Sequence, residues 1–139
     1  MSAFEIVEVF DRECRSYDFS VVNLANGDMV GHTGDLDSAK QAVEALDRAT
    51  ARFIEICQRE HIDLLITADH GNCETMGTPE SPVTSHTTNL VPFWYIREGA
   101  VISTRPTGGL ANITPTILDI MGIERGREME EGLLWGGRK

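Results

Sequence analysis

The sequence predicts an α/β protein with a mainly parallel sheet flanked by helices. Residues 19–25 (FSVVNLA) and 62–68 (IDLLITA) are short apolar runs of the kind that form buried strands. An amphipathic pattern of helical period begins after Gly34 and lies between these two runs. A strand, a helix and a second strand in this order predict a right-handed crossover between parallel strands.

The first two helices are predicted from the spacing of their apolar residues. The chain opens on a helix, because Ser2 and Glu5 have the spacing of a capping box and apolar residues recur every three or four positions to about Tyr17. The long helix after Gly34 has an apolar stripe made of Ala39, Ala42, Val43, Leu46, Phe53, Ile54 and Cys57. Its other faces are charged, so we expect it to cover one face of the sheet.

The second half of the chain is less regular. Residues 71–89 are polar and predict a loop of a length that is usually functional or disordered. Two more strands are predicted at residues 91–96 and 101–104. A short helix begins near Thr114 and ends at Gly122.

The whole chain, residues 1–139, is expected to form a single domain. Its length is enough to bury a core, and no repeat, low-complexity tract or internal linker divides it. The charged tail, about residues 124–139, contains the candidate docking side chains Met129, Leu133, Leu134 and Trp135.

The charge of the chain excludes some classes of partner. With 22 acidic and 12 basic residues the formal net charge is −10, and the basic residues do not cluster. We therefore expect neither nucleic acid nor a membrane as a partner. If the substrate is an anion such as a phosphate ester, bound divalent metal ions are the most direct means of reversing the local potential.

The sequence predicts a cytoplasmic protein. The N-terminus has acidic residues where a signal peptide requires basic ones, and the longest apolar stretch, residues 90–96, is far too short to span a membrane. Cys14, Cys57 and Cys73 are an odd number without a C-x-x-C spacing, which indicates neither a disulfide framework nor a thiolate zinc site.

Histidines and carboxylates follow both predicted strands directly. Asp28 and His32 come after the first strand, and Asp69 and His70 come after the second. Because the carboxyl ends of parallel strands meet at one edge of a sheet, we expect the two motifs to be neighbours. His86, in the long polar loop, can fold over the same edge as a further ligand.

The spacing within each motif favours metal binding. Asp28 and His32 are four residues apart, so one turn of helix aims both at a common point, and Gly31 permits a close approach of the backbone. The side chains of Asp69 and His70 diverge, which suits bridging between two positions. Oxygen and imidazole donors without thiolates favour manganese, zinc, iron or magnesium, and three histidines count against magnesium.

Other candidate residues have simpler explanations. His61 lies at a helix-to-strand junction and is expected to be structural. Cys14 and Cys57 fall on apolar helix faces and are expected to pack in the core. Cys73, two residues past Gly71, is expected to be a small buried side chain rather than a ligand.

Four ordered motifs resemble one enzyme family over nearly the whole chain. They are NLANGDMVGHTG (residues 23–34), LLITADHGNCE (64–74), TSHTTNLVPF (84–93) and GGLANITPTILDIMGI (108–123). In order and spacing they are similar to the closing segments of the 2,3-bisphosphoglycerate-independent phosphoglycerate mutases, which belong with the alkaline phosphatases and sulfatases. The resemblance implies part of an alkaline-phosphatase-like sandwich.

The resemblance also implies a set of metal ligands and a reaction. Members of the family interconvert 3-phosphoglycerate and 2-phosphoglycerate, a glycolytic step, through a phosphoserine at two manganese ions. Asp28, His32 and His86 match the ligands of one ion, and Asp69 and His70 match two ligands of the other. Zn²⁺, Co²⁺ or Fe²⁺ can replace Mn²⁺ in such donor sets.

The nucleophilic serine, another aspartate ligand and the glycerate-binding domain of the family lie upstream of the matched region. The resemblance therefore implies a C-terminal fragment without a catalytic residue of its own, which binds phosphoglycerate only together with the upstream part and is inactive alone. A chain of this kind is expected to self-associate through an exposed sheet edge.

Three alternatives remain open at this point. Another member of the alkaline phosphatase superfamily, such as a phosphopentomutase, shares the general architecture. A non-catalytic module that binds a metal or a partner chain needs no nucleophile. A two-histidine, one-carboxylate iron site built from Asp28, His32 and His86 is typical of oxygenases.

Overall fold

The computed structural model describes residues 2–134, and the chain divides into two compact units, Met1–Ala100 and Val101–Lys139. The fold is α/β, as predicted, with helices and small sheets. Among the described residues, every helix is too short or too polar to cross a membrane. That residues 1–139 form one domain stays a prediction.

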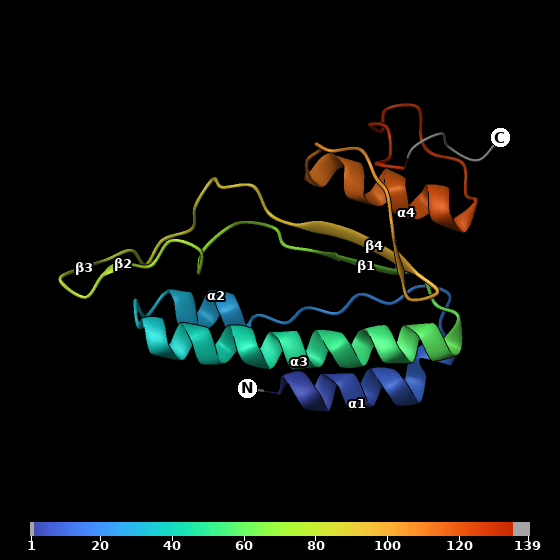
Figure 1. The fold of residues 1–139 in the computed structure, drawn as a ribbon. Helices are drawn as coiled ribbons and strands as arrows, with labels where there is room; N and C mark the ends of the chain where they lie inside the picture. Colours follow the sequence, from blue (N-terminus) through green and yellow to red (C-terminus); the bar gives the residue numbers. More distant parts are fainter. Residues whose placement is uncertain (1, 135–139) are drawn as a thin grey trace. The chain divides into compact units, whose positions relative to one another are not determined.

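Three helices form the base of the first unit (Figure 1). They are α1 (Ala3–Glu13), α2 (Asn26–Gly31) and α3 (Leu36–Glu60), and a short 3-10 turn, η1 (Cys14–Ser16), extends α1. Both α1 and α2 lie along α3. The long helix is therefore the surface on which the other two pack.

The core of this unit lies between α1 and α3. Val7 of α1 and Ile56 of α3 are almost fully buried, and the rings of Phe10 and Phe53 meet edge to face with their centroids 5.1 Å apart. Such aromatic pairs stabilise a core beyond the area that they bury. The predicted helical spacing is confirmed, although Val43 of the predicted stripe is half exposed.

The ends of α3 are fixed by local hydrogen bonds. The Asp35 carboxylate accepts from the backbone N–H of Asp37 at 3.2 Å, which caps the N-terminus. His61 adopts a left-handed backbone conformation with φ of 58°, and its N–H closes the last turn on Cys57 and Gln58. The structural role predicted for His61 is confirmed. At the start of α1, Ser2 is the N-cap residue but its side chain makes no capping bond.

The principal sheet has the order β1-β4-β5. Strand β1 (Leu64–Thr67) pairs with β4 (Phe93–Arg97), and Leu65 lies opposite Tyr95. Strand β5 (Ala100–Ile102) follows β4 after a turn in which both Glu98 and Gly99 have positive φ. Two consecutive positive φ angles are the signature of the tight hairpin turn that matches the twist of the strands.

The prediction of a mainly parallel sheet is wrong for β1 and β4, because these two strands pair antiparallel. The chain returns from β1 to β4 through residues 68–92, a long excursion that reverses its direction. This excursion includes a small hairpin of β2 (Gly77–Thr78) and β3 (Ser81–Pro82), within the predicted loop. The sequence pattern identifies strands, but direction depends on which neighbour a strand finds.

Residues 19–25, predicted as a strand, form none within the described part of the chain. The segment runs between α1 and α2 (Figure 1), and residues 19–24 make no hydrogen bond to another described residue. Phe19 and Val21 are exposed, Val21 to 80%. The predicted crossover is therefore not formed, because the apolar run has no strand beside it.

The second unit is built around α4 (Ile113–Met121), which follows a 3-10 turn, η2 (Leu110–Asn112). The helix begins at Ile113, one residue before the predicted Thr114, with Asn112 as its N-cap residue. It ends at Gly122, as predicted, where φ is 70°. The Thr116 hydroxyl is fully buried and accepts from the backbone N–H of Leu133 at 2.8 Å.

Leu133 is buried beside this helix, which confirms it as a docking residue of the tail. Met129 remains partly exposed. Trp135, the last of the predicted docking side chains, lies outside the described residues.

The unpaired segment at residues 19–24 predicts that the chain self-associates. Free backbone donors and acceptors beside exposed apolar side chains favour pairing with another chain. Val21→Lys places a charge on this segment and should reduce the average mass measured by light scattering at high concentration. Leu90→Lys, at a 93% exposed position outside the segment, is the matched control and should leave that mass unchanged. A chain that is strictly monomeric at high concentration would contradict the prediction.

Candidate metal centre

Helix α2 positions two of the candidate ligands. Asp28 lies in its first turn, and His32, the C-cap residue, follows four positions later on the same face. The Nε2 atom of His32 lies 3.3 Å from Oδ1 of Asp28. The pair is thus aimed at a common point by one turn of helix, as the spacing predicts.

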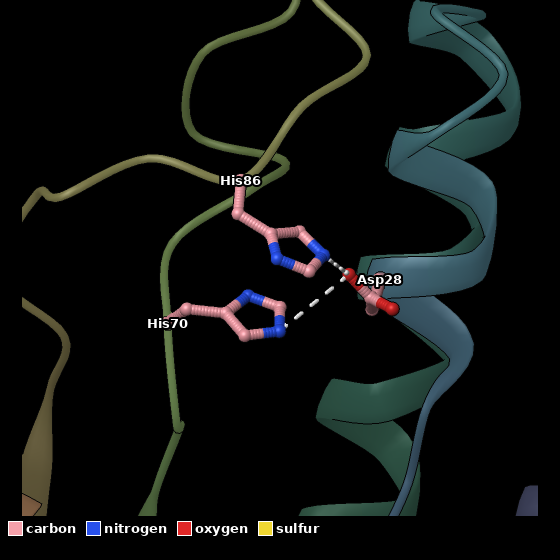
Figure 2. Close-up of side chains that lie close together, drawn as sticks. All are labelled: Asp28, His70 and His86. Atoms are coloured by element: carbon pink, nitrogen blue, oxygen red, sulfur yellow. Dashed lines mark ion pairs between the residues drawn. The ribbon is translucent and has the colours of Figure 1, made fainter.

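Two loops of the first unit bring further imidazoles to the same carboxylate oxygen. His70 follows β1, and His86 lies in the excursion between β1 and β4. The Nε2 atoms of His86 and His70 lie 3.2 Å and 3.9 Å from Oδ1 of Asp28, and Figure 2 shows both rings pointing toward it. The two rings are stacked with centroids 3.6 Å apart. With His32, four side chains from three separate segments therefore form one cluster.

The donor atoms have the mutual spacing that one metal ion requires. The Nε2 atoms of His32 and His86 are 3.1 Å apart, and each lies within 3.3 Å of Oδ1 of Asp28. Around an ion with bonds of about 2.0–2.2 Å, neighbouring ligand atoms lie about 3.0–3.5 Å apart. The three atoms fit this spacing without rearrangement.

A second set of three residues shares two members with the set Asp28, His32 and His86. Asp28, His70 and His86 also present ligand atoms that all lie within 4.8 Å of one another. Its spacing is looser than that of the His32 triad. Asp28 and His86 are common to both, so the cluster offers four donors around one carboxylate oxygen.

Hydrogen bonds to backbone carbonyls set the ring orientation of two histidines. Nδ1 of His32 lies 2.6 Å from the carbonyl oxygen of Thr84, and Nδ1 of His70 lies 3.4 Å from that of Gly71. A carbonyl only accepts, so each Nδ1 is the protonated nitrogen in these contacts and donates. The Nε2 atoms are then free to act as ligands, which is the usual arrangement at metal-binding histidines.

Asn72 holds the central carboxylate in place. Its Nδ2 donates to Oδ1 of Asp28 at 2.8 Å, and Asn72 itself is 7% exposed. This hydrogen bond lowers the pKa of Asp28, and the imidazoles of His32, His86 and His70 act in the same direction against the effect of burial. Asp28 is therefore held as the anion, the form that binds a cation.

The approach of Asn72 depends on a glycine. A Cβ atom at Gly31 would lie 2.1 Å from the Oδ1 atom of Asn72. The predicted need for a small residue at this position is confirmed. The sequence motif contained Asn72, but its spacing alone gave no reason to assign it a role.

Glu74 is a second residue whose role the sequence does not predict. Its carboxylate accepts from the backbone N–H of Asn72 at 2.6 Å, from the Thr87 hydroxyl and from Nδ2 of Asn89 at 3.0 Å. These donors, with the Thr87 hydroxyl first, lower the pKa of Glu74 to about 2. A carboxylate four residues after His70 is the only sequence signal that points to it.

The remaining candidates lie at the edge of the cluster. The Asp69 side chain is 80% exposed, and its Oδ1 lies 3.6 Å from Nε2 of the adjacent His70. The thiol of Cys73 donates to the carbonyl oxygen of Gly27 at 2.8 Å, and burial raises its pKa. Cys73 is therefore half-buried rather than buried, and its thiol is not one of the donor atoms of the triad Asp28, His70 and His86.

Curated proteins similar to this chain are 2,3-bisphosphoglycerate-independent phosphoglycerate mutases. The chain is 43% identical over 130 residues to that of Moorella thermoacetica and 46% identical over 134 residues to that of Clostridium novyi. Each alignment covers 93% of this chain, but 25% and 26% of the respective relative. The chain thus spans about a quarter of the length of these relatives.

A solved structure and a family model agree with this similarity. The fold matches a phosphoglycerate mutase of Leishmania mexicana, crystallised at low cobalt concentration, with a TM-score of 0.84 and 32% identity. That match covers 97% of this chain and 28% of the Leishmania chain, and supports the alkaline-phosphatase-like fold expected from the motifs. The model of the Metalloenzyme superfamily matches residues 1–125. The chain belongs to the Metalloenzyme superfamily.

Proposed function

We propose that this chain is the metal-binding C-terminal part of a cofactor-independent phosphoglycerate mutase, an isomerase that converts 3-phosphoglycerate to 2-phosphoglycerate in glycolysis. The observation that carries the proposal is the convergence of three imidazole Nε2 atoms on Oδ1 of Asp28. The similarity to phosphoglycerate mutases over nearly the whole chain supports the same activity.

Asp28, His32 and His86 are proposed to hold one divalent ion. Their ligand atoms have the spacing for a single ion, and Asn72 orients the carboxylate. Asp69 and His70 are proposed as two ligands of a second ion, whose other ligands come from outside the chain. When bound, two such ions neutralise charge on phosphoryl oxygens and lower the pKa of an attacking hydroxyl.

Manganese is the proposed metal, because imidazole and carboxylate donors without thiolates suit Mn²⁺, and Zn²⁺, Co²⁺ or Fe²⁺ can take the same donors. The chain's own residues position the cation, and in a chain with a net charge of −10 such cations are the most direct means of reversing the local potential near an anionic phosphate. The proposed location is the cytoplasm, which agrees with three free cysteines.

The nucleophile and most of the residues that bind the substrate are proposed to lie on another segment or chain. A phosphoserine route needs an activated serine, and no serine of this chain matches the one that the family uses. Phosphoglycerate is therefore expected to bind only when the upstream part is present. The exposed run at residues 19–24 is the proposed place where strands of that part dock, or where two copies of this chain meet.

Metal binding is tested by calorimetric titration of the 139-residue chain with Mn²⁺ and Zn²⁺. We expect His32→Ala to weaken the tighter site at least tenfold, because one of three protein ligands is lost. His61→Asn is the control, since His61 ends α3 and is no candidate ligand, and asparagine tolerates its left-handed backbone. Equal affinities of the unmodified chain and His32→Ala would remove this residue from the ligand set.

Activity is tested on the pure chain saturated with manganese. We expect no detectable conversion of 3-phosphoglycerate to 2-phosphoglycerate, because the enzyme's nucleophile is missing. Adding a fragment that supplies the upstream serine and glycerate-binding domain should restore conversion, and Asp28→Ala should abolish the restored rate. Robust conversion by the pure chain, lost in Asp28→Ala, would show that the nucleophile lies within these 139 residues.

A further inference from the structure

We infer that Glu74 is a positioning residue that clamps the loop carrying His70 to the loop carrying His86. The inference rests on the proposed metal-binding function, because the alignment of His70 and His86 matters only if these imidazoles bind a metal ion. It concerns a residue that touches none of the candidate ligands directly. Its basis is a set of contacts around one carboxylate.

The first observation is that Glu74 accepts hydrogen bonds from both loops. Oε2 accepts from the backbone N–H of Asn72, two residues after His70, at 2.6 Å. Oε1 accepts from the hydroxyl of Thr87, the residue after His86, and from Nδ2 of Asn89 at 3.0 Å. One side chain therefore joins two segments that are more than ten residues apart in sequence.

The second observation is that the loops also meet through their backbones beside this carboxylate. The N–H of Thr87 donates to the carbonyl of Gly71 at 2.8 Å, and the two residues form an isolated bridge. A Cβ atom at Gly71 would lie 2.3 Å from both Oε1 of Glu74 and Oγ1 of Thr87. A larger residue at position 71 would therefore displace the Glu74 carboxylate and the Thr87 hydroxyl from their present positions.

The third observation is the absence of a competing partner. In the described part of the chain, Glu74 forms no ion pair with a lysine or arginine, and all of its contacts are with neutral donors of these two loops. Hydrogen bonds to an ionised acceptor are about twice as strong as neutral ones. The carboxylate therefore contributes to loop alignment and not to a surface ion pair.

The contacts of Glu74 fix the residues that directly follow the two histidines. Gly71 follows His70 and Thr87 follows His86, so the clamp fixes the chain directly next to both ligand candidates. Their rings are stacked at an angle of 16°, and both Nε2 atoms face Asp28, as Figure 2 shows. Releasing the clamp would let the His86 loop move relative to His70 and would loosen the ligand set.

The chain offers a graded set of variants for the test. Glu74→Gln keeps the size of the side chain but replaces one acceptor oxygen by a donor nitrogen, so the three donors can no longer all be satisfied. Thr87→Val removes only the hydroxyl, and Thr87→Ser retains it. Glu80→Gln, elsewhere in the same excursion, removes a carboxylate that forms no hydrogen bond or ion pair among the described residues and serves as the matched control.

Two readouts are measured on each variant of the 139-residue chain. The first is Co²⁺ titration followed by visible absorption, which reports both affinity and coordination geometry. We expect Glu74→Gln and Thr87→Val to bind Co²⁺ about 10- to 100-fold more weakly with an altered spectrum, as at other metal sites that lose an outer partner. Thr87→Ser and Glu80→Gln should retain the affinity and spectrum of the unmodified chain.

The second readout is hydrogen exchange of the Thr87 amide in the metal-free chain, which separates the clamp from the metal function. Protection of this amide should fall in Glu74→Gln and in Thr87→Val but not in Glu80→Gln. If the unmodified chain binds no Co²⁺, the proposed function fails and exchange alone decides the clamp. Unchanged Thr87 protection in folded Glu74→Gln, or in Thr87→Val should Glu74→Gln not fold, would overturn the inference. Unchanged Co²⁺ affinity and spectrum in both variants would also overturn it.

Discussion

The arrangement of this part of the molecule depends on a single carboxylate oxygen that meets three imidazoles. Oδ1 of Asp28 has the Nε2 atoms of His32, His86 and His70 around it at 3.2–3.9 Å. Two nitrogens 3.1 Å apart beside an anion repel one another unless a proton or a metal ion lies between them. The arrangement of these donors suggests a metal ion, and hydrogen bonds from Asn72 to Asp28 and between the histidines and backbone carbonyls hold the donors in place.

The grouping of Asp28 with three imidazoles depends on features at some distance from the cluster. Helix α2 supplies Asp28 and packs on α3, which is itself fixed by the core that it forms with α1. Gly31 allows Asn72 to reach the carboxylate, and Gly71 allows the two histidine loops to touch. At each of these positions a Cβ atom would meet side-chain oxygens, of Asn72 at Gly31 and of Glu74 and Thr87 at Gly71.

The candidate site could be predicted from sequence better than the sheet could. Asp28 and His32 are one helical turn apart, and local spacing is sufficient to bring them together. The antiparallel pairing of β1 with β4 is set by a return of the chain over residues 68–92, which no local pattern encodes. The roles of Asn72 and Glu74 depend on contacts with α2 and with the His86 loop, so they become visible only in three dimensions.

The most direct measurement of the central claim is X-ray absorption of the chain loaded with one equivalent of Co²⁺. It counts the imidazole and oxygen ligands of the bound ion without depending on turnover. We predict a mixed nitrogen and oxygen shell with at least two imidazoles, and loss of imidazole scattering in a His32→Ala, His86→Ala double variant. A shell of oxygen atoms alone, or one that is unchanged in the double variant, would contradict the claim that these side chains form the metal centre.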